Sequence, residues 1–151
     1  MARYSSDFQR TGSTTASLGS WIADATRPRR LKLYDLSLGS EATPADAAVL
    51  WTLQRCTAGG TSTGVTPQPL DPADAATESD AGENHTIEPT YTAGAILLNI
   101  PLNQRATYRW VAAPGGELVF PATASNGFGI QTDTISTGTP VITATSHAEE
   151  Q

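Results

Sequence analysis

The side chains that could do chemistry are few and scattered along this chain of 151 residues. The only histidines are His85 and His147, and the only cysteine is Cys56. A zinc site needs three or four ligands, which these residues do not supply at metal-like spacing. No serine lies in a nucleophile-elbow pattern, and no glycine-rich stretch has the lysine of a phosphate-binding loop. We therefore predict a protein that is not an enzyme and uses no cofactor or metal.

The same residues have plainer structural interpretations. Cys56 ends an apolar run, which is typical of a small buried hydrophobe. His85 begins a predicted strand and is expected at the surface or as a cap, and His147 lies in a polar tail. The tryptophans lie in or beside predicted strands and favour core packing, with exposed sugar-stacking platforms as the alternative: Trp21, Trp51 and Trp110.

A run of acidic residues lies in residues 58–83 and raises the question of calcium. Its members are Asp71, Asp74, Glu78, Asp80 and Glu83. Their spacing does not match an EF-hand loop, and acidic loops are usually solvated. We expect a solvated loop, with a calcium site as the alternative.

Composition favours an all-β protein. Hydrophobic residues make up 38% of the chain and charged residues 16%, where about a quarter of residues are charged in ordinary soluble domains. Threonine, glycine and proline fill the difference, and these are residues of strands and turns. The length predicts one domain. No apolar run suggests a membrane span or a secretory signal.

Alternation of apolar and polar residues predicts eight or nine short strands. In residues 30–38 (RLKLYDLSL) the alternation slips by one position at Tyr34-Asp35, which predicts a β-bulge. In residues 102–130 a strand through Tyr108 and Trp110 is followed by Pro114-Gly115-Gly116 and a second strand, which predicts a hairpin. A helix is the alternative for residues 44–53, but we prefer a strand from 49 to 56.

These strands predict a single-domain β-sandwich over residues 16–146. It is expected to be jelly-roll-like, because the Cys-Trp-Cys pattern of immunoglobulin domains is absent. Residues 1–15 are polar and aperiodic, which predicts an extended N-terminal arm. Residues 58–83 are expected to form one long acidic loop that is functional or ordered against another chain. Residues 147–151 are expected to form an exposed acidic tail.

Charge is divided unevenly along the chain. Residues 1–32 contain six basic and two acidic residues, a net charge of +4, whereas the remainder contains three basic and thirteen acidic residues, a net charge of −10. A basic head on an acidic body suggests a molecule oriented toward an acidic partner, with ordinary surface charge as the alternative. Nucleic acid is disfavoured as that partner, because phosphates repel an acidic body.

Three stretches within residues 65–130 carry a resemblance. VTPQPLDPADAA, GENHTIEPTYTAGAILL and LNQRATYRWVAAPGGELVFPA resemble small virion structural proteins of tailed bacteriophages, usually described as head-decoration (cement) proteins. The resemblance implies a compact β domain, commonly a homotrimer, that binds the major capsid protein on the outer capsid surface and braces adjacent capsomers. It also implies synthesis in the bacterial cytoplasm, with which a chain without disulfides is compatible.

The expected contacts follow from the charge pattern and this resemblance. Contacts with the capsid are predicted in the N-terminal part, at Arg3, Tyr4, Phe8, Arg10, Arg27, Arg29 and Arg30. Contacts between subunits are predicted at Arg105, Tyr108 and Arg109, the two arginines being expected to share a face of one strand. No membrane or nucleic acid is expected as a partner. The alternative function is a receptor- or carbohydrate-binding module of a phage tail or fibre.

Overall fold

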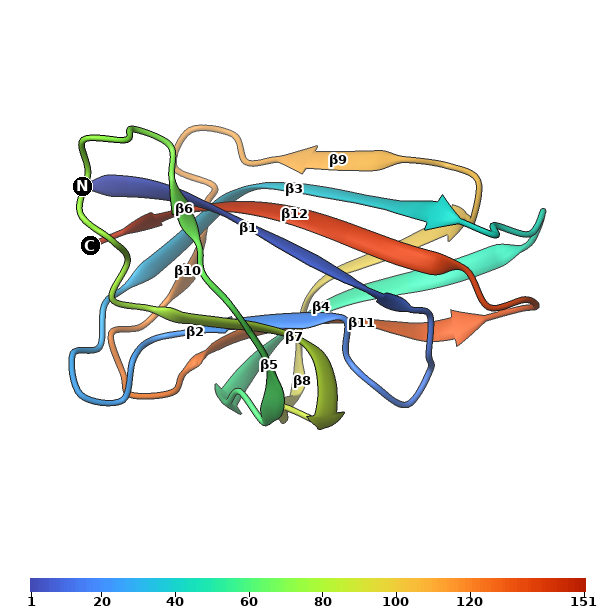
Figure 1. Ribbon diagram of the computed structural model, residues 1–151, viewed down its shortest axis with the longest axis horizontal. Helices are drawn as coiled ribbons and strands as arrows, with labels where there is room; N and C mark the ends of the chain where they lie inside the picture. Colours follow the sequence, from blue (N-terminus) through green and yellow to red (C-terminus); the bar gives the residue numbers. More distant parts are fainter.

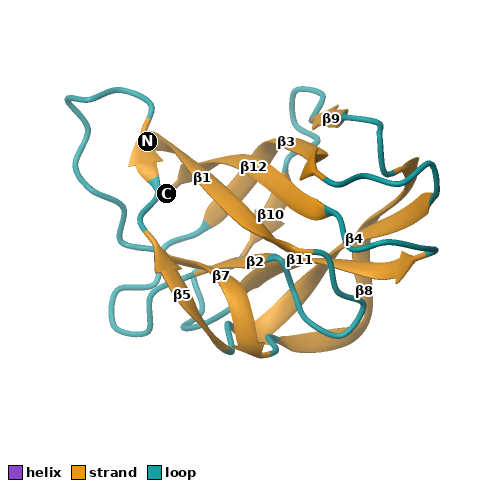
Figure 2. Cartoon of the chain, turned by 45° about the vertical axis from the view of Figure 1, so that its right-hand side comes forward, coloured by secondary structure: helices purple, strands orange, loops and turns teal.

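The computed structural model describes all of residues 1–151 and consists of β-strands, turns and loops (Figure 2). The twelve strands are β1 (Ala2–Thr11), β2 (Gly19–Ile22), β3 (Leu31–Ala42), β4 (Ala48–Ala58), β5 (Thr61–Val65), β6 (Gln68–Pro69), β7 (Asp80–Ile87), β8 (Thr90–Asn103), β9 (Tyr108–Val111), β10 (Leu118–Phe120), β11 (Gly127–Ile135) and β12 (Val141–Glu150). No helix is long and apolar enough to cross a membrane.

The strands form two antiparallel sheets that face each other (Figure 1). Sheet I has the order β10-β3-β12-β1-β6, with β9 also paired to β3, and sheet II has the order β5-β7-β2-β11-β4-β8. One apolar core holds them together, and its largest side chains include Trp21, Trp51, Phe8, Phe120 and Phe128. The all-β sandwich predicted from composition is therefore confirmed.

Strand pairing follows a nested order from the termini inward. β1 pairs with β12, β2 with β11, β3 with β10, and β4 with β8. These pairs alternate between sheet I and sheet II, as expected for a long hairpin rolled into two layers, which is the jelly-roll arrangement. β5, β6 and β7 are inserted between β4 and β8 and widen both sheets.

The β-bulge predicted in β3 is present. His147 pairs with Asp35 and Ala148 pairs with Leu33, so Tyr34 is the extra residue on β3. The bulge reverses the alternation of the strand, and the leucines on both sides of it point into the core as a result. Leu31, Leu33, Leu36 and Leu38 are all buried. Strand β4 likewise confirms the preference for a strand over a helix.

The hairpin predicted at Pro114-Gly115-Gly116 is wrong. β9 and β10 do not pair with each other; both pair with β3, at Leu38–Asp35 and Leu33–Leu31 respectively. Since β12 occupies the opposite edge of β3, β9 and β10 are two sections of one interrupted edge strand. The turn itself exists: Gly116 N–H donates to Ala113 O, and Gly115 has φ of 80°. It closes a small outward loop within that strand.

The predicted N-terminal arm is also wrong. Residues 2–11 form β1, which lies between β12 and β6 in sheet I (Figure 1). Tyr4, Ser6 and Phe8 face the core, each no more than 2% exposed. Two aromatic residues separated by four positions with a small residue between them occupy one face of a strand. The packing of these two aromatic side chains against the core makes the segment a strand, although its composition is mostly polar.

Part of the acidic segment is a loop, as predicted, but that loop and the C-terminal tail are held by contacts within their own chain. Residues 58–83 include β5 and β6, and 147–151 fall largely within β12. The Glu150 carboxylate accepts hydrogen bonds from Thr77 Oγ1 and Ser79 N, both at 2.9 Å. Ser79 Oγ in turn accepts one from Trp21 Nε1 at 2.7 Å. A tail carboxylate therefore holds the end of the long segment against the core.

Candidate functional site

Two of the predicted capsid contacts lie inside the molecule. Tyr4 is 2% exposed and Phe8 is 1% exposed. The Tyr4 hydroxyl donates to the Ala75 carbonyl oxygen, and burial raises its pKa. A side chain packed in the core cannot touch another protein without unfolding, so these two assignments are wrong.

Most basic residues of the N-terminal part lie at one end of the sandwich, where they meet acidic residues: Glu149 stands opposite both Arg3 and Lys32 in sheet I. Arg3 approaches Glu149 at 3.8 Å, and Arg27 approaches Glu78 at 2.8 Å. Arg10 lies toward the far end of β1, where its guanidinium donates to the carbonyl of Ser17. Two of the six basic residues of this part, Arg3 and Arg27, are therefore paired with acidic residues from later in the chain.

Arg29 and Arg30 differ from the other basic residues of this group. Both are exposed, and neither forms an ion pair within the chain. The backbone of Arg30 exchanges two hydrogen bonds with Gln151. The loop between β2 and β3 that carries them therefore lies at the end of the sandwich where both termini lie (Figure 1).

The residues predicted between subunits lie at or near the free edge of sheet I. Tyr108 is 37% exposed on β9, and Arg105 is exposed in the turn before it, so the two arginines do not share one strand. Arg109 forms a bidentate pair with the Asp35 carboxylate, from Nε at 2.9 Å and Nη2 at 2.6 Å. Arg109 thus ties the edge strand to β3 within one chain.

The Asp35 carboxylate contacts two basic side chains, Arg109 and His147. His147 Nδ1 lies 3.1 Å from its Oδ2, so the histidine of the supposed tail belongs to the same cluster. The hydrogen bonds from Arg109 hold the pKa of the Asp35 carboxyl below its usual value, against the opposing effect of burial. Asp35 is therefore a stable anion at neutral pH.

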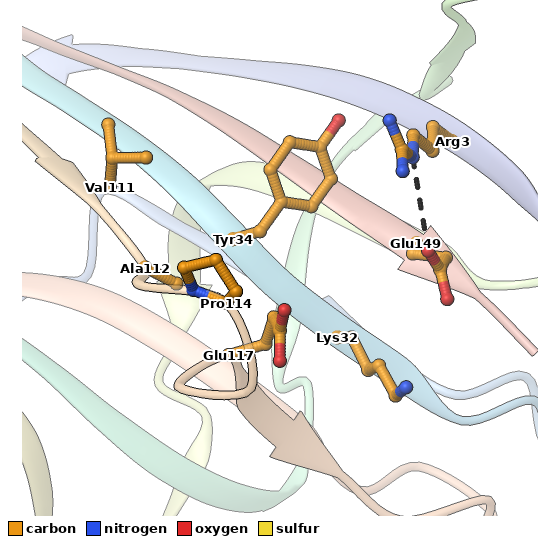
Figure 3. A pocket seen from close by; sticks show the side chains of 8 residues that line it. All are labelled: Arg3, Lys32, Tyr34, Val111, Ala112, Pro114, Glu117 and Glu149. Carbon is orange, nitrogen blue, oxygen red and sulfur yellow. Dashed lines mark ion pairs between the residues drawn. The ribbon is translucent and has the colours of Figure 1, made fainter.

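A cavity of about 270 Å³ opens beside this cluster on the outer face of sheet I. It forms where the Tyr34 bulge of β3 meets the loop that interrupts the edge strand, and Ala112 N–H donates to Tyr34 O between them. Figure 3 shows the Tyr34 ring among the side chains of that loop and of β1, β3 and β12. The cavity is lined by Arg3, Lys32, Tyr34, Val111, Ala112, Pro114, Glu117 and Glu149.

Some polar groups of this Tyr34 pocket are unused by the chain. The Tyr34 hydroxyl and the Lys32 ammonium make no hydrogen bond or ion pair, while Arg3 sits 5.6 Å from the Tyr34 ring centroid. Burial raises the pKa of Tyr34, so its phenol stays protonated at neutral pH. Backbone N–H groups at Glu117 and Gly115 lower the pKa of the Glu117 carboxyl. The pocket therefore offers both donors and an ionised acceptor.

A second polar cluster lies on sheet II and is closed. Ser17 donates from its N–H and its hydroxyl to the Glu88 carboxylate, and its Oγ lies 2.6 Å from the Tyr91 hydroxyl. Ser17 is fully buried, and burial raises the pKa of Tyr91 far above its ordinary value. These groups bind each other and leave nothing for a ligand.

His85 adjoins the closed cluster and is buried, so its predicted surface position is wrong. Its Nε2 lies 3.0 Å from the Gly59 carbonyl oxygen and 2.9 Å from Ser20 Oγ. A carbonyl oxygen only accepts, which places the proton on Nε2. In this tautomer His85 cannot take a proton from Ser20, and burial lowers its pKa further. The Ser20–His85 contact is therefore structural.

Cys56 and the tryptophans have the structural roles that their positions favoured. Cys56 is buried, and burial raises the pKa of its thiol to about 12. Trp21 and Trp51 are 0% and 2% exposed, which overturns the alternative that they stack on a sugar. Trp110 packs partly against the core. No three histidine, cysteine or acidic side chains come together as a metal site would require.

The Tyr34 pocket is not predictable from the sequence alone. The available signal was the phase slip at Tyr34-Asp35, since bulges redirect side chains and are common at functional sites. The loop at residues 112–117, which forms the other side of the pocket, has the local sequence pattern of a hairpin turn. Comparison with known protein families, with characterised proteins and with solved structures gives no match.

Proposed function

We propose that this protein is a structural component of a tailed-bacteriophage virion that binds the outer surface of the capsid and stabilises contacts between capsomers. The observation that carries the proposal is the nested jelly roll, an architecture that viral capsid domains use widely. The resemblance of residues 65–130 to phage decoration proteins supports it independently. Several of the chain's reactive side chains are occupied in holding the fold.

The surface proposed to contact the shell is the end that carries Arg29 and Arg30. Both side chains are exposed and free of ion pairs, and they lie beside the termini. Free guanidinium groups bind carboxylates in a planar, bidentate geometry. Many copies on a symmetric shell make individually weak contacts sufficient through avidity.

The proposed homotrimer would use the open edge of sheet I. β9 and β10 have no strand beyond them, and Tyr108, Val111 and Val119 are exposed there. An open edge with apolar side chains favours association with another chain. Of the residues predicted between subunits, Tyr108 and Arg105 remain available, whereas Arg109 is engaged with Asp35.

The proposal is tested by co-sedimentation of the purified protein with empty shells of the major capsid protein. We expect the wild type to bind the shells in many copies per particle. The double variant Arg29→Ala, Arg30→Ala should reduce occupancy at least ten-fold. Thr92→Glu, Ala93→Glu is a matched control, because it makes the same change in net charge at exposed positions in β8. Equal occupancy of the two variants would refute the arginine contact, and no binding of the wild type would refute the function.

A further inference from the structure

The Tyr34 pocket exists because two irregularities in neighbouring strands coincide. β3 contains one extra residue at Tyr34, and the edge strand beside it leaves the sheet between Val111 and Leu118. An uninterrupted pair of strands would keep side chains standing in parallel rows with no hollow between them. The bulge and the loop together open a cavity of about 270 Å³, just below the range of typical small-ligand sites.

The lining of the pocket combines an apolar wall with balanced charge. Tyr34, Pro114 and Val111 supply the apolar surface. Two cations, Arg3 and Lys32, and two carboxylates, Glu117 and Glu149, surround it, and Arg3 and Glu149 pair with each other (Figure 3). The charges of the lining sum to zero, so the pocket selects neither a simple anion nor a simple cation by its net charge. The site therefore favours an uncharged ligand that donates and accepts hydrogen bonds and has an apolar face.

A sugar ring has this combination of properties, since its hydroxyls both donate and accept and its C–H face packs against an aromatic ring. We propose that the Tyr34 pocket binds a neutral saccharide, with Tyr34 and Pro114 against the ring and with Glu117 and Lys32 hydrogen-bonded to its hydroxyls.

The unused groups of the pocket support this assignment. Lys32 and the Tyr34 hydroxyl have no partner in the chain, and Glu117 accepts only backbone hydrogen bonds. Polar groups that are already satisfied, as in the Ser17–Glu88–Tyr91 cluster, gain little from a ligand. The proposal goes beyond capsid binding, because its central residues are not those proposed to contact the shell.

The test is a nuclear magnetic resonance titration of the ¹⁵N-labelled full chain with methyl glycosides of glucose, galactose and mannose and with N-acetylglucosamine. At least one sugar should shift the amides of Val111, Ala112 and Glu117 in a saturable way. Tyr34→Ala should weaken that binding at least ten-fold, and Tyr34→Phe should retain most of it. Tyr108→Ala, an exposed tyrosine outside the pocket, is the matched control and should leave the affinity unchanged.

Glu117→Gln and Lys32→Ala provide a second route if Tyr34→Ala does not fold, and each should weaken binding several-fold. Free lysine is titrated in parallel as a zwitterionic competitor. Saturable shifts from lysine with none from any sugar would overturn the proposal. Sugar shifts that lie elsewhere, or that persist in the folded pocket variants, would overturn it as well.

Discussion

The Tyr34 pocket and the Ser17–Glu88–Tyr91 cluster contain similar residues and differ in how those residues are used. Each has a tyrosine and a glutamate with an arginine nearby. In the cluster, Glu88 accepts from the amide and hydroxyl of Ser17, which also contacts Tyr91. In the pocket, the Tyr34 hydroxyl makes no hydrogen bond, and Glu117 has backbone partners only. Residue type is therefore a poor guide to function unless the partners are known.

The two sites also differ in the cost of losing a residue. Removing one member of a buried, satisfied network leaves its partners without hydrogen bonds, and the fold loses stability. Removing a side chain that reaches solvent and has few partners leaves the fold almost unchanged. The following experiments use this contrast, beginning with the largest expected effect.

Cys56 reports whether the closed region opens. It lies close enough to Tyr91 to influence its ionisation, and its own thiol pKa is raised to about 12 from an ordinary value of 9.0. At pH 8 the thiolate population falls about 1,000-fold below that of a free cysteine. We expect the thiol reagent DTNB to react at least that much more slowly with the native protein than with the chain in urea. Similar rates in both conditions would show that sheet II opens readily.

Glu88→Ala and Glu117→Ala compare the two sites directly. Glu88→Ala should lower the free energy of unfolding by about 2 kcal/mol, because it leaves the buried donors of Ser17 without an acceptor. Glu117→Ala should leave it nearly unchanged, since the carboxylate reaches solvent and accepts only backbone hydrogen bonds. Urea denaturation of both variants gives the two values. Equal losses in the free energy of unfolding would contradict the proposed difference between the closed cluster and the open pocket.

Replacing Asp35 should lower the free energy of unfolding by an amount between those of Glu88→Ala and Glu117→Ala, and the loss should depend on pH. The pKa of Asp35 is lower in the folded chain than the value near 4 expected on unfolding, so its ionised form stabilises the fold above that pH. Asp35→Asn should cost about 1 kcal/mol at pH 7, a modest value because the Arg109 side chain is largely exposed.

The advantage of wild type over Asp35→Asn should then shrink as the pH falls below about 4, where Asp35 of the unfolded chain takes up a proton first, and it should be lost once the pH passes the lower pKa of the folded chain. Asp7→Asn is the control, since Asp7 is exposed and has no ion pair. Thermal melts at several pH values give the comparison. A difference between wild type and Asp35→Asn that stays constant from pH 7 to pH 3 would contradict the role of the Asp35–Arg109 pair.

The sequence predicts the fold well where alternation is strong. The strands around Leu31, Trp51 and Ile130 and the bulge at Tyr34 could be read directly, because one buried face fixes the phase of a strand. β1 was missed because only Tyr4 and Phe8 mark its inner face among polar residues. The pairing partner of each strand is harder to predict. The turn at Gly115 is a local feature, but whether the strands on either side of it pair with each other depends on β3, which is distant in sequence.

The candidate site was less predictable for the same reason. The surroundings of the Tyr34 hydroxyl, which has no hydrogen-bond partner, depend on β1 and on the loop at residues 112–117. The hydrogen bond of the Tyr91 hydroxyl depends on Ser17. Those contacts join segments that are far apart in the chain. The pattern of apolar and polar residues within one strand carries no information about them. Charge along the sequence was misleading for Arg3 and Arg27, because both meet acids from the C-terminal part or the long segment.

We propose that this protein acts through polar groups that the fold leaves free, with Arg29 and Arg30 in contact with the capsid. A cryo-electron microscopy reconstruction of decorated shells tests it most directly. We predict a jelly roll on the outer surface, with the β2–β3 loop and both termini against the shell. A reconstruction in which the protein is absent, or docks through β8 and the closed face of sheet II, would contradict the account.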